Sequence, residues 1–348
     1  MIYLDNASTS FHKPDCVARA VVEAMQQAGN SGRGSSGEAM EASRIIFDTR
    51  CRIAQMFDAE GPECVAFTAN ATEALNTALF GILHPEREKV HAICTEMDHN
   101  SVLRPLYLLE KEGLDLTILP ADRKGMISLT ELESSIRPET RAIICTHASN
   151  LTGNRNDIRA IGEIAKKHKK LFVLDAAQTA GVFPISMKKD HIDILCFSGH
   201  KGLMGPQGTG AICVRPGVHV EPLKVGGSGI LTFQKEHPRD MPEALEAGTL
   251  NSHGIAGLRA ALEWIQETGV NQIREKEQML MWRFYDQVKK IPGVTVYGDF
   301  SQKDRSPVVT LNIGDEGSGE VGMALGEEYG ISVRSGGHCA PLMHEALG

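Results

Sequence analysis

Two polar residues that could hold a cofactor follow buried apolar runs. Asp175 ends the run 171–174, and Lys201 closes the segment 198–201 (Ser-Gly-His-Lys) after a second run, 192–197. At the end of a buried strand, a carboxylate can keep a pyridine nitrogen protonated, and a lysine amine can form a Schiff base with an aldehyde. Either residue alone is better explained as a polar group where a strand meets water. Together they predict a site for pyridoxal 5'-phosphate (PLP).

The phosphate of such a cofactor needs hydrogen-bond donors, and two segments offer them. The sequence 67–74 predicts a strand, a turn and a helix start, which leaves the backbone N–H groups of Ala71 and Thr72 free to face an anion. Ser198 and His200 add neutral side-chain donors. The alternative for Thr72 is a plain helix N-cap.

His99 follows another buried run, in the segment 96–100 (Glu-Met-Asp-His-Asn). At the same sheet edge its imidazole could stack on an aromatic ring. A lone histidine before a helix is more often structural. Position alone leaves both interpretations open.

Seven short apolar runs have the near-continuous hydrophobicity of fully buried strands. They occupy residues 64–68, 90–94, 116–119, 142–145, 171–174, 192–197 and 211–214. Segments with helical spacing lie between several of them, for example 72–83, 101–110 and 158–168. This alternation predicts an α/β fold with a mainly parallel central sheet and helices on both faces. Ligands in such sheets bind beyond the carboxyl ends of the strands.

The pattern changes after residues 246–249 (Glu-Ala-Gly-Thr). Two longer helical stretches, 253–267 and 271–290, precede a strand candidate at 308–313. The change predicts a smaller α+β domain. We therefore expect a large cofactor-binding domain over residues 15–250 and a small domain formed by residues 1–14 with 251–348.

Composition and charge argue against several functional classes. The 348 residues are 42% hydrophobic and 23% charged, which is typical of a folded protein. The net charge is −8, and no dense basic run could follow a phosphate backbone, so we do not expect nucleic acid as a partner. We find no signal-peptide core and no apolar stretch long enough to cross a bilayer. We therefore expect a cytoplasmic protein.

The cysteines and glycines predict neither a metal site nor a dinucleotide site. None of the eight cysteines belongs to a Cys-x-x-Cys pair. Five lie in apolar runs, where small buried side chains are usual: Cys64, Cys94, Cys145, Cys196 and Cys213. A G-x-G-x-x-G pattern occurs at 32–37, but residues 16–28 before it are predicted to form a helix instead of the strand that a dinucleotide unit requires.

Six motifs in order resemble the signatures of class V aminotransferase-fold PLP enzymes, and the best match is to the cysteine desulfurase branch. They are Thr68-x-x-Ala71-Thr72-Glu73, Glu96-x-x-His99, His147-Ala148-Ser149-Asn150-x-x-Gly153, Asp175-x-x-Gln178, Ser198-Gly199-His200-Lys201 and Glu246-Ala247-Gly248-Thr249. The similarity extends from residues 3–7 to the last residues. It implies the type I fold of PLP-dependent transferases and a homodimer.

The resemblance also implies a role for each matched position. Lys201 would bind PLP covalently, Asp175 would contact the pyridine nitrogen and His99 would stack on the ring. Asn150 and Gln178 would lie near the ring hydroxyl. The phosphate would be held by Ala71, Thr72, Ser198 and His200, and by Thr249 of the neighbouring subunit.

Arg334 and Cys339 lie close together in the segment 332–341. Arginine offers a planar fork for a carboxylate, and the glycines at 336 and 337 give the following thiol freedom to approach a cofactor. A protonated His338 or His344 nearby would favour the thiolate. A free cysteine is most often structural.

However, the pattern Arg-x-Gly-x-His-Cys-Ala resembles the catalytic-cysteine loop of the second group of cysteine desulfurases. That likeness implies that Arg334 and Asn150 bind L-cysteine and that Lys201, His99 and Cys339 are catalytic. Alanine would be released. The sulfur would remain as a persulfide on Cys339 for an acceptor protein, as in iron–sulfur cluster assembly.

Departures from the family pattern leave alternatives open. Ala244-Leu245 stands where many relatives have an arginine, and Asn70-Ala71 replaces the commoner Gly-Thr. The chain stops at Gly348, where the family continues, so we expect a small domain that is either truncated or completed differently. The alternatives are a selenocysteine lyase or a transaminase that uses the same cofactor, or a sulfur carrier with little turnover.

Overall fold

A seven-stranded sheet forms the centre of the computed structural model, which describes residues 1–28 and 37–348. Its strand order is β2-β8-β7-β6-β5-β3-β4. The strands are β2 (Val65–Thr68), β3 (His91–Thr95), β4 (Asp115–Leu119), β5 (Thr140–Thr146), β6 (Leu171–Asp175), β7 (Ile194–Ser198) and β8 (Gly210–Val214). Strand β8 is antiparallel to both neighbours, and the other pairs are parallel. The expected strands and the mainly parallel sheet are confirmed.

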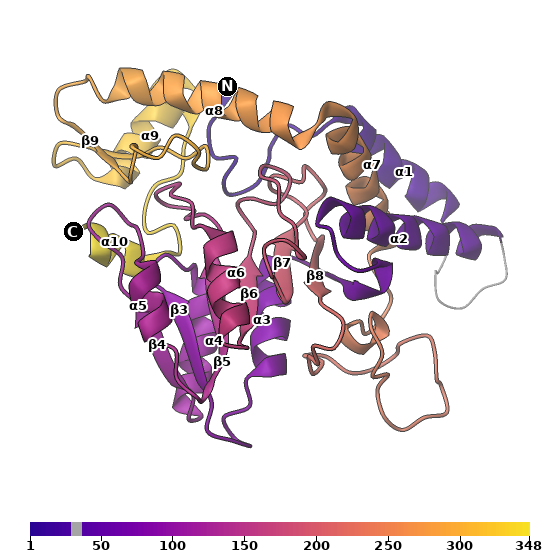
Figure 1. The fold of residues 1–348 in the computed structure, drawn as a ribbon. Coiled ribbons are helices and arrows are strands. Elements are labelled where there is room, and N and C mark those ends of the chain that lie inside the picture. The colour runs from indigo at the N-terminus through magenta and orange to yellow at the C-terminus, as the bar shows by residue number, and fades with distance from the viewer. Residues whose placement is uncertain (29–36) are drawn as a thin grey trace.

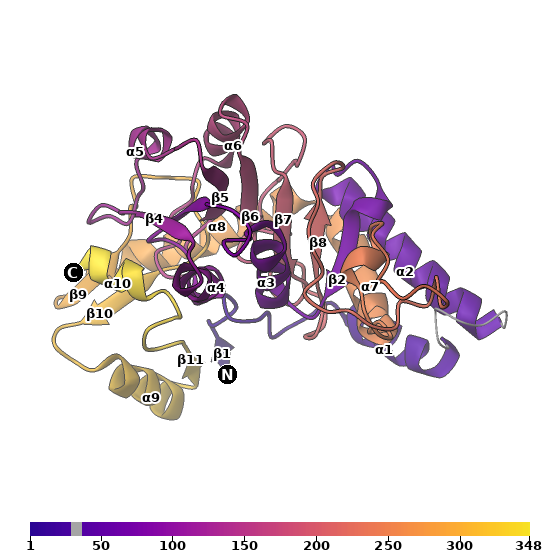
Figure 2. The ribbon, with the colours of Figure 1, turned by 90° about the horizontal axis from the view of Figure 1, so that it is seen from below.

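Helices cover both faces of this sheet (Figure 2). One face carries α3 (Ala71–Ile82) and α4 (Asn100–Lys111). The other carries α1 (Asp15–Gln27), α2 (Gly37–Met56), α5 (Leu129–Ser134), α6 (Ile158–Lys167) and α7 (Ser252–Thr268). In β6, Phe172 and Leu174 enter the core on one side and Val173 enters the core on the other. Because successive side chains of a strand alternate, a strand buried on both faces must be apolar throughout.

Helix α1 confirms the helix expected before the G-x-G-x-x-G pattern. Residues 32–36 of that pattern lie outside the described residues. The apolar residues of α7 belong to the same core as the sheet. The domain boundary at residue 250 stays a prediction.

A smaller group of elements follows α7. Helix α8 (Val270–Val288) runs along the top of Figure 1 and leads to the antiparallel pair β9 (Val294–Tyr297) and β10 (Thr310–Ile313). These precede α9 (Ser318–Tyr329), β11 (Ile331–Ser332) and α10 (Pro341–Leu347). Strand β1 (Ile2–Tyr3) pairs in parallel with β11. The first residues therefore lie beside the segment that carries Arg334.

The loop after β5 is bound to this smaller group. The Asp299 N–H donates to Asn154 Oδ1 at 2.8 Å, and the Ser306 N–H donates to the carbonyl of Gly153 at 2.8 Å. Gly153 has φ +73°, and a Cβ there would lie 2.8 Å from the Ser306 carbonyl oxygen, so only glycine fits. Arg305 is fully buried and donates to the carbonyl of Thr152. The loop that carries Asn150 is thus held by the segment between β9 and β10.

Among the described helices, none combines the length and apolar composition that crossing a bilayer needs.

Candidate active site

Asp175 is the last residue of β6 and is buried at the carboxyl edge of the sheet. Its Oδ1 accepts a hydrogen bond from the Ala177 N–H at 2.8 Å, while Oδ2 has no hydrogen-bond donor among the described residues. Burial raises the pKa of this carboxyl, and the Ala177 N–H and the charge of Lys201 act in the opposite direction. One oxygen is therefore fixed, and the other can meet a cationic ligand atom.

Lys201 follows β7 at the same edge. Its Nζ makes no hydrogen bond or ion pair with the described part of the chain, and burial lowers its pKa. A lower pKa increases the fraction of free amine, which is the nucleophilic form.

The turn before Lys201 is held by the N-terminal segment. The carbonyl of His200 accepts hydrogen bonds from the N–H and hydroxyl of Ser10, at 3.1 and 3.0 Å, and from the Thr9 hydroxyl at 3.2 Å. The His200 Nδ1 lies 3.0 Å from that same Thr9 hydroxyl. Burial lowers the pKa of His200 to about 4, so its ring is a neutral donor at pH 7.

The N-terminus of α3 lies against this turn. The Ala71 N–H donates to Ser198 Oγ at 2.8 Å. Asn70 caps the helix by accepting the Glu73 N–H at 3.0 Å, so the plain-cap alternative for Thr72 is wrong. The Thr72 hydroxyl instead lies 2.9 Å from Ser101 Oγ. Helix N–H groups and small hydroxyls thus gather where an anion would be held.

His99 has a structural role that also orients its ring. It is the N-cap of α4, and its Nδ1 accepts the Ser101 N–H at 3.0 Å. The proton of the neutral ring is then assigned to Nε2. Burial lowers the pKa of His99 to about 4, and the positive charges of Lys201 and Arg334 act in the same direction. A neutral ring in a fixed orientation is suited to stacking.

Asn150 and Gln178 contact neighbouring loops through their amide nitrogens. Asn150 Nδ2 donates to the His338 carbonyl at 2.7 Å. Gln178 Nε2 donates to the Ala7 carbonyl at 2.9 Å. Asn150 therefore connects the loop after β5 to the segment of Cys339.

Arg334 and Cys339 line one open pocket of about 420 Å³. Cys339 is exposed with φ +56°, and its carbonyl accepts the Asn100 N–H at 2.8 Å. Burial lowers the pKa of His338, so its ring is neutral near pH 7. The lowered pKa of His338 disfavours the protonated ring that would help to form the thiolate. Help from His344 stays a prediction.

Thr249 is exposed, and its side chain makes no hydrogen bond to the described residues. Its segment is nevertheless anchored, because buried Glu246 pairs with Arg50 at 2.7 Å and accepts the Phe67 N–H at 2.7 Å. Arg50 was not among the expected site residues. A charged residue on the apolar face of a helix was the available signal.

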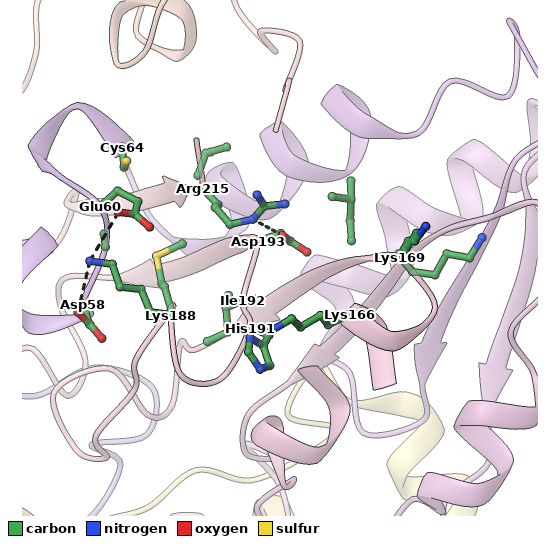
Figure 3. A pocket seen from close by; sticks show the side chains of 15 residues that line it. Asp58, Glu60, Cys64, Lys166, Lys169, Lys188, His191, Ile192, Asp193 and Arg215 are labelled. Carbon is green, nitrogen blue, oxygen red and sulfur yellow. Dashed lines mark hydrogen bonds and ion pairs between the residues drawn. The ribbon is translucent and has the colours of Figure 1, made fainter. Parts of the chain in front are cut away.

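A larger pocket of about 580 Å³ lies at the opposite edge of the sheet, at the amino ends of β6 and β7 (Figure 3). There Lys188 lies 3.8 Å from Asp58 and 3.6 Å from Glu60, and Arg215 pairs with Asp193 at 2.6 Å. None of the predicted site residues lines this pocket. It is also at the edge where α/β sheets do not bind substrates.

Comparisons with known proteins assign the family. The family model described as aminotransferase class-V matches residues 2–347. This chain belongs to the class-V aminotransferase family. A probable cysteine desulfurase of Methanothermobacter thermautotrophicus is 33% identical over 353 residues, covering 99% of this chain and 87% of the relative. A cysteine desulfurase of Escherichia coli is 32% identical over 352 residues, covering 99% and 85%.

A solved structure shows the same relationship. The apo cysteine desulfurase of Thermococcus onnurineus NA1 matches with a TM-score of 0.93 and 32% identity, covering 99% of this chain and 87% of that chain. Family and fold class are therefore confirmed, and the chain is a member of a family of PLP-dependent enzymes.

The residues fit the cofactor of this family. The Lys201 amine, which has no hydrogen-bond partner among the described residues, suits an aldehyde, and the unpaired Oδ2 of Asp175 suits a protonated pyridine nitrogen. The start of α3 suits a phosphate, although the Ala71 N–H, which was expected to be free, donates to Ser198 Oγ.

Proposed function

We propose that this protein is a PLP-dependent cysteine desulfurase that converts L-cysteine to L-alanine and collects the sulfur on Cys339. The observation that carries the proposal is the pocket shared by Arg334 and Cys339. Both residues are also close enough to Lys201 for their charges to affect its pKa. A cation for the substrate carboxylate and a thiol thus share one pocket, within electrostatic range of an amine.

In this proposal the cofactor is held by the residues at the carboxyl edge of the sheet. Lys201 would bind it covalently, Asp175 would contact its ring nitrogen, and His99 would stack on the ring. Asn150 and Gln178 would lie near the ring hydroxyl. The phosphate would be held by Ala71, Thr72, Ser198 and His200, with Thr249 supplied by the partner in a homodimer. When bound, PLP supplies an electron sink for charge at the substrate α-carbon.

The chain's own residues carry the remaining steps. Arg334, with Asn150, binds the carboxylate of L-cysteine and fixes its orientation. The amine of Lys201 moves the α-proton. The Cys339 thiolate forms a bond to the substrate sulfur while the bond from that sulfur to the β-carbon breaks. The β-carbon keeps the electron pair and gains a proton, which yields alanine and a persulfide.

Incubation with L-cysteine tests this function. We expect alanine release over many turnovers and a gain of one sulfur atom on the peptide that contains Cys339, measured by mass spectrometry. Cys339→Ser should lose both products while keeping PLP, and Cys51→Ser, in a half-buried helical cysteine, should keep both.

Other outcomes select the alternatives. A single round of labelling without further alanine would indicate a sulfur carrier. Turnover of L-selenocysteine that survives Cys339→Ser, without turnover of L-cysteine, would indicate a selenocysteine lyase. Amino-group transfer to a keto acid would indicate a transaminase.

A further inference from the structure

The N-terminal segment reaches the predicted substrate arginine through the parallel pair β1–β11. In this pair Tyr3 lies opposite Ser332, and the Leu4 N–H donates to the Ser332 carbonyl at 2.8 Å. Continuing the register by two residues brings Asp5 opposite Arg334. The strand pairing therefore brings a carboxylate and a guanidinium from opposite ends of the chain close together.

The two charges are connected through a hydroxyl. Ser8 Oγ donates to Asp5 Oδ1 at 2.5 Å, and Arg334 Nη1 donates to Ser8 Oγ at 2.6 Å. The Ser8 N–H also donates to the Asp5 carbonyl at 3.1 Å, which fixes the turn. We call this arrangement the Asp5–Ser8–Arg334 bridge.

The direction of each hydrogen bond follows from the donor inventory. Arginine has only donors and an ionised aspartate has only acceptors, so the serine hydroxyl must accept from Arg334 and donate to Asp5. Because Asp5 takes the single hydroxyl proton, the oxygen lone pairs are available to Nη1. The carboxylate thus orients the hydroxyl, and the hydroxyl orients the guanidinium.

Because Asp5 contacts Arg334 only through Ser8, part of the guanidinium stays free to bind a ligand. A bidentate carboxylate on Arg334 would occupy the fork that a substrate carboxylate needs. Here only Nη1 is engaged, and Nε and Nη2 make no hydrogen bond to the described residues. The guanidinium is held in place while one edge of its fork stays free.

We propose that Ser8, oriented by Asp5, is a positioning residue that holds Arg334 ready for the carboxylate of an amino acid ligand. The inference rests on the proposed function for the role of Arg334. It adds the N-terminal segment to the determinants of substrate affinity.

Equilibrium binding to the PLP-loaded protein tests the bridge. L-alanine carries the carboxylate and lacks the thiol, whereas ethylamine lacks the carboxylate. By calorimetry we expect Ser8→Ala to weaken L-alanine binding about tenfold, which is about 1.4 kcal/mol, and to leave ethylamine binding within about twofold. Ser8→Thr retains the hydroxyl and should restore the L-alanine affinity.

A matched control is available in the small group of elements. Ser301 also donates to an aspartate, Asp299, at 2.6 Å, without an arginine on its hydroxyl. Ser301→Ala should leave both affinities unchanged. In turnover assays Ser8→Ala should raise KM for L-cysteine about tenfold with kcat within about twofold.

The outcomes separate this inference from the proposed function. Equal weakening of L-alanine and ethylamine, or no weakening of either, would overturn the bridge. A protein that desulfurates L-cysteine but binds L-alanine independently of Ser8 refutes the bridge alone. A protein without desulfurase activity whose L-alanine affinity depends on Ser8 refutes the proposed activity and supports the bridge.

Discussion

Burial keeps the histidines around the site neutral. It lowers the pKa of His99 and His200 to about 4 and that of His147 to about 3. His147 is the extreme case, because it is fully buried and neither ring nitrogen has a hydrogen-bond partner among the described residues. Its backbone N–H donates to the carbonyl of Asp175 at 2.9 Å, so His147 is directly bonded to the backbone of a predicted site residue.

The unpaired ring predicts a pH-dependent stability difference. The folded-state pKa of His147 is about 3 and the unfolded value is near 6.5, so the unfolded state binds the extra proton between these values. Its contribution to the free energy of unfolding is therefore present above pH 6.5 and is lost as pH falls toward 3. From pH 8 to pH 5, the free energy of unfolding of the wild type should fall by about 2 kcal/mol more than that of His147→Leu. Urea unfolding at both pH values measures this, and an equal change at both would refute it.

The carboxyl group of Asp98 changes stability with pH in the opposite direction. Burial raises its pKa to about 7, although its carboxylate accepts hydrogen bonds from Thr95 and Thr146. The contribution of Asp98 to the free energy of unfolding is therefore present below about pH 4 and is lost as pH rises toward 7. Because Asp98 is present in both proteins of the His147 comparison, its effect cancels there.

At the scale of elements, side chains from distant parts of the chain connect the starts of helices to neighbouring strands. Asn70 caps α3 at the turn that also meets Ser198. The buried pair of Arg50 and Glu246 joins α2 to the segment of Thr249, and the Glu246 carboxylate also accepts the N–H of Phe67 in β2. These contacts hold the start of α3 against Ser198 and the segment of Thr249 against α2.

Loss of the α3 cap should weaken both stability and cofactor binding. Asn70→Ala is expected to cost about 1 kcal/mol of unfolding free energy, because the Glu73 N–H loses its acceptor. It should also lower PLP affinity, since the same helix start is expected to face the phosphate. Ser128→Ala removes the cap of α5 and should cost a similar amount without affecting PLP. Chemical denaturation and equilibrium PLP titration measure the two effects, and equal PLP affinities in both variants would contradict the placement.

At the scale of the whole molecule, one long segment presents apolar side chains to solvent. Part of the segment 219–249 loops away from the body of the molecule at the lower right of Figure 1. Val225 is 69% exposed and Phe233 102% exposed, and Thr249 at the end of the segment is exposed as well. Apolar side chains exposed on the same segment as Thr249, whose hydroxyl has no partner among the described residues, are consistent with the proposed homodimer.

The dimer predicts a concentration-dependent effect of one surface residue. Phe233→Asp should shift the protein toward monomers and accelerate PLP release, because Thr249 would no longer reach the partner's site. Met323→Asp, on exposed helix α9, is the control and should change neither. Sedimentation at several protein concentrations and the rate of PLP loss measure the two effects. A wild-type protein that is monomeric at all concentrations would contradict the proposal.

The central sheet could be predicted because its signal is local. Strands buried on both faces are short continuous apolar runs, so residues 171–174 and 192–197 identify their strands without knowledge of neighbours. The two-residue strands β1 and β11 were not predicted, because two residues carry no periodicity and their pairing joins the two ends of the chain. Helix α9 has no buried residue and hence no strong apolar face.

By itself the sequence determined the chemical inventory and its order along the chain: Asp175 and Lys201 after buried strands, and Cys339 in a glycine-rich segment. Only the tertiary structure decided which groups meet, such as Ser8 with Arg334 and Arg50 with Glu246. It also decided that Asn70 and not Thr72 caps α3. Apolar periodicity depends on neighbours within a few residues, whereas a hydrogen bond between distant residues depends on strand register, packing and the burial of both partners.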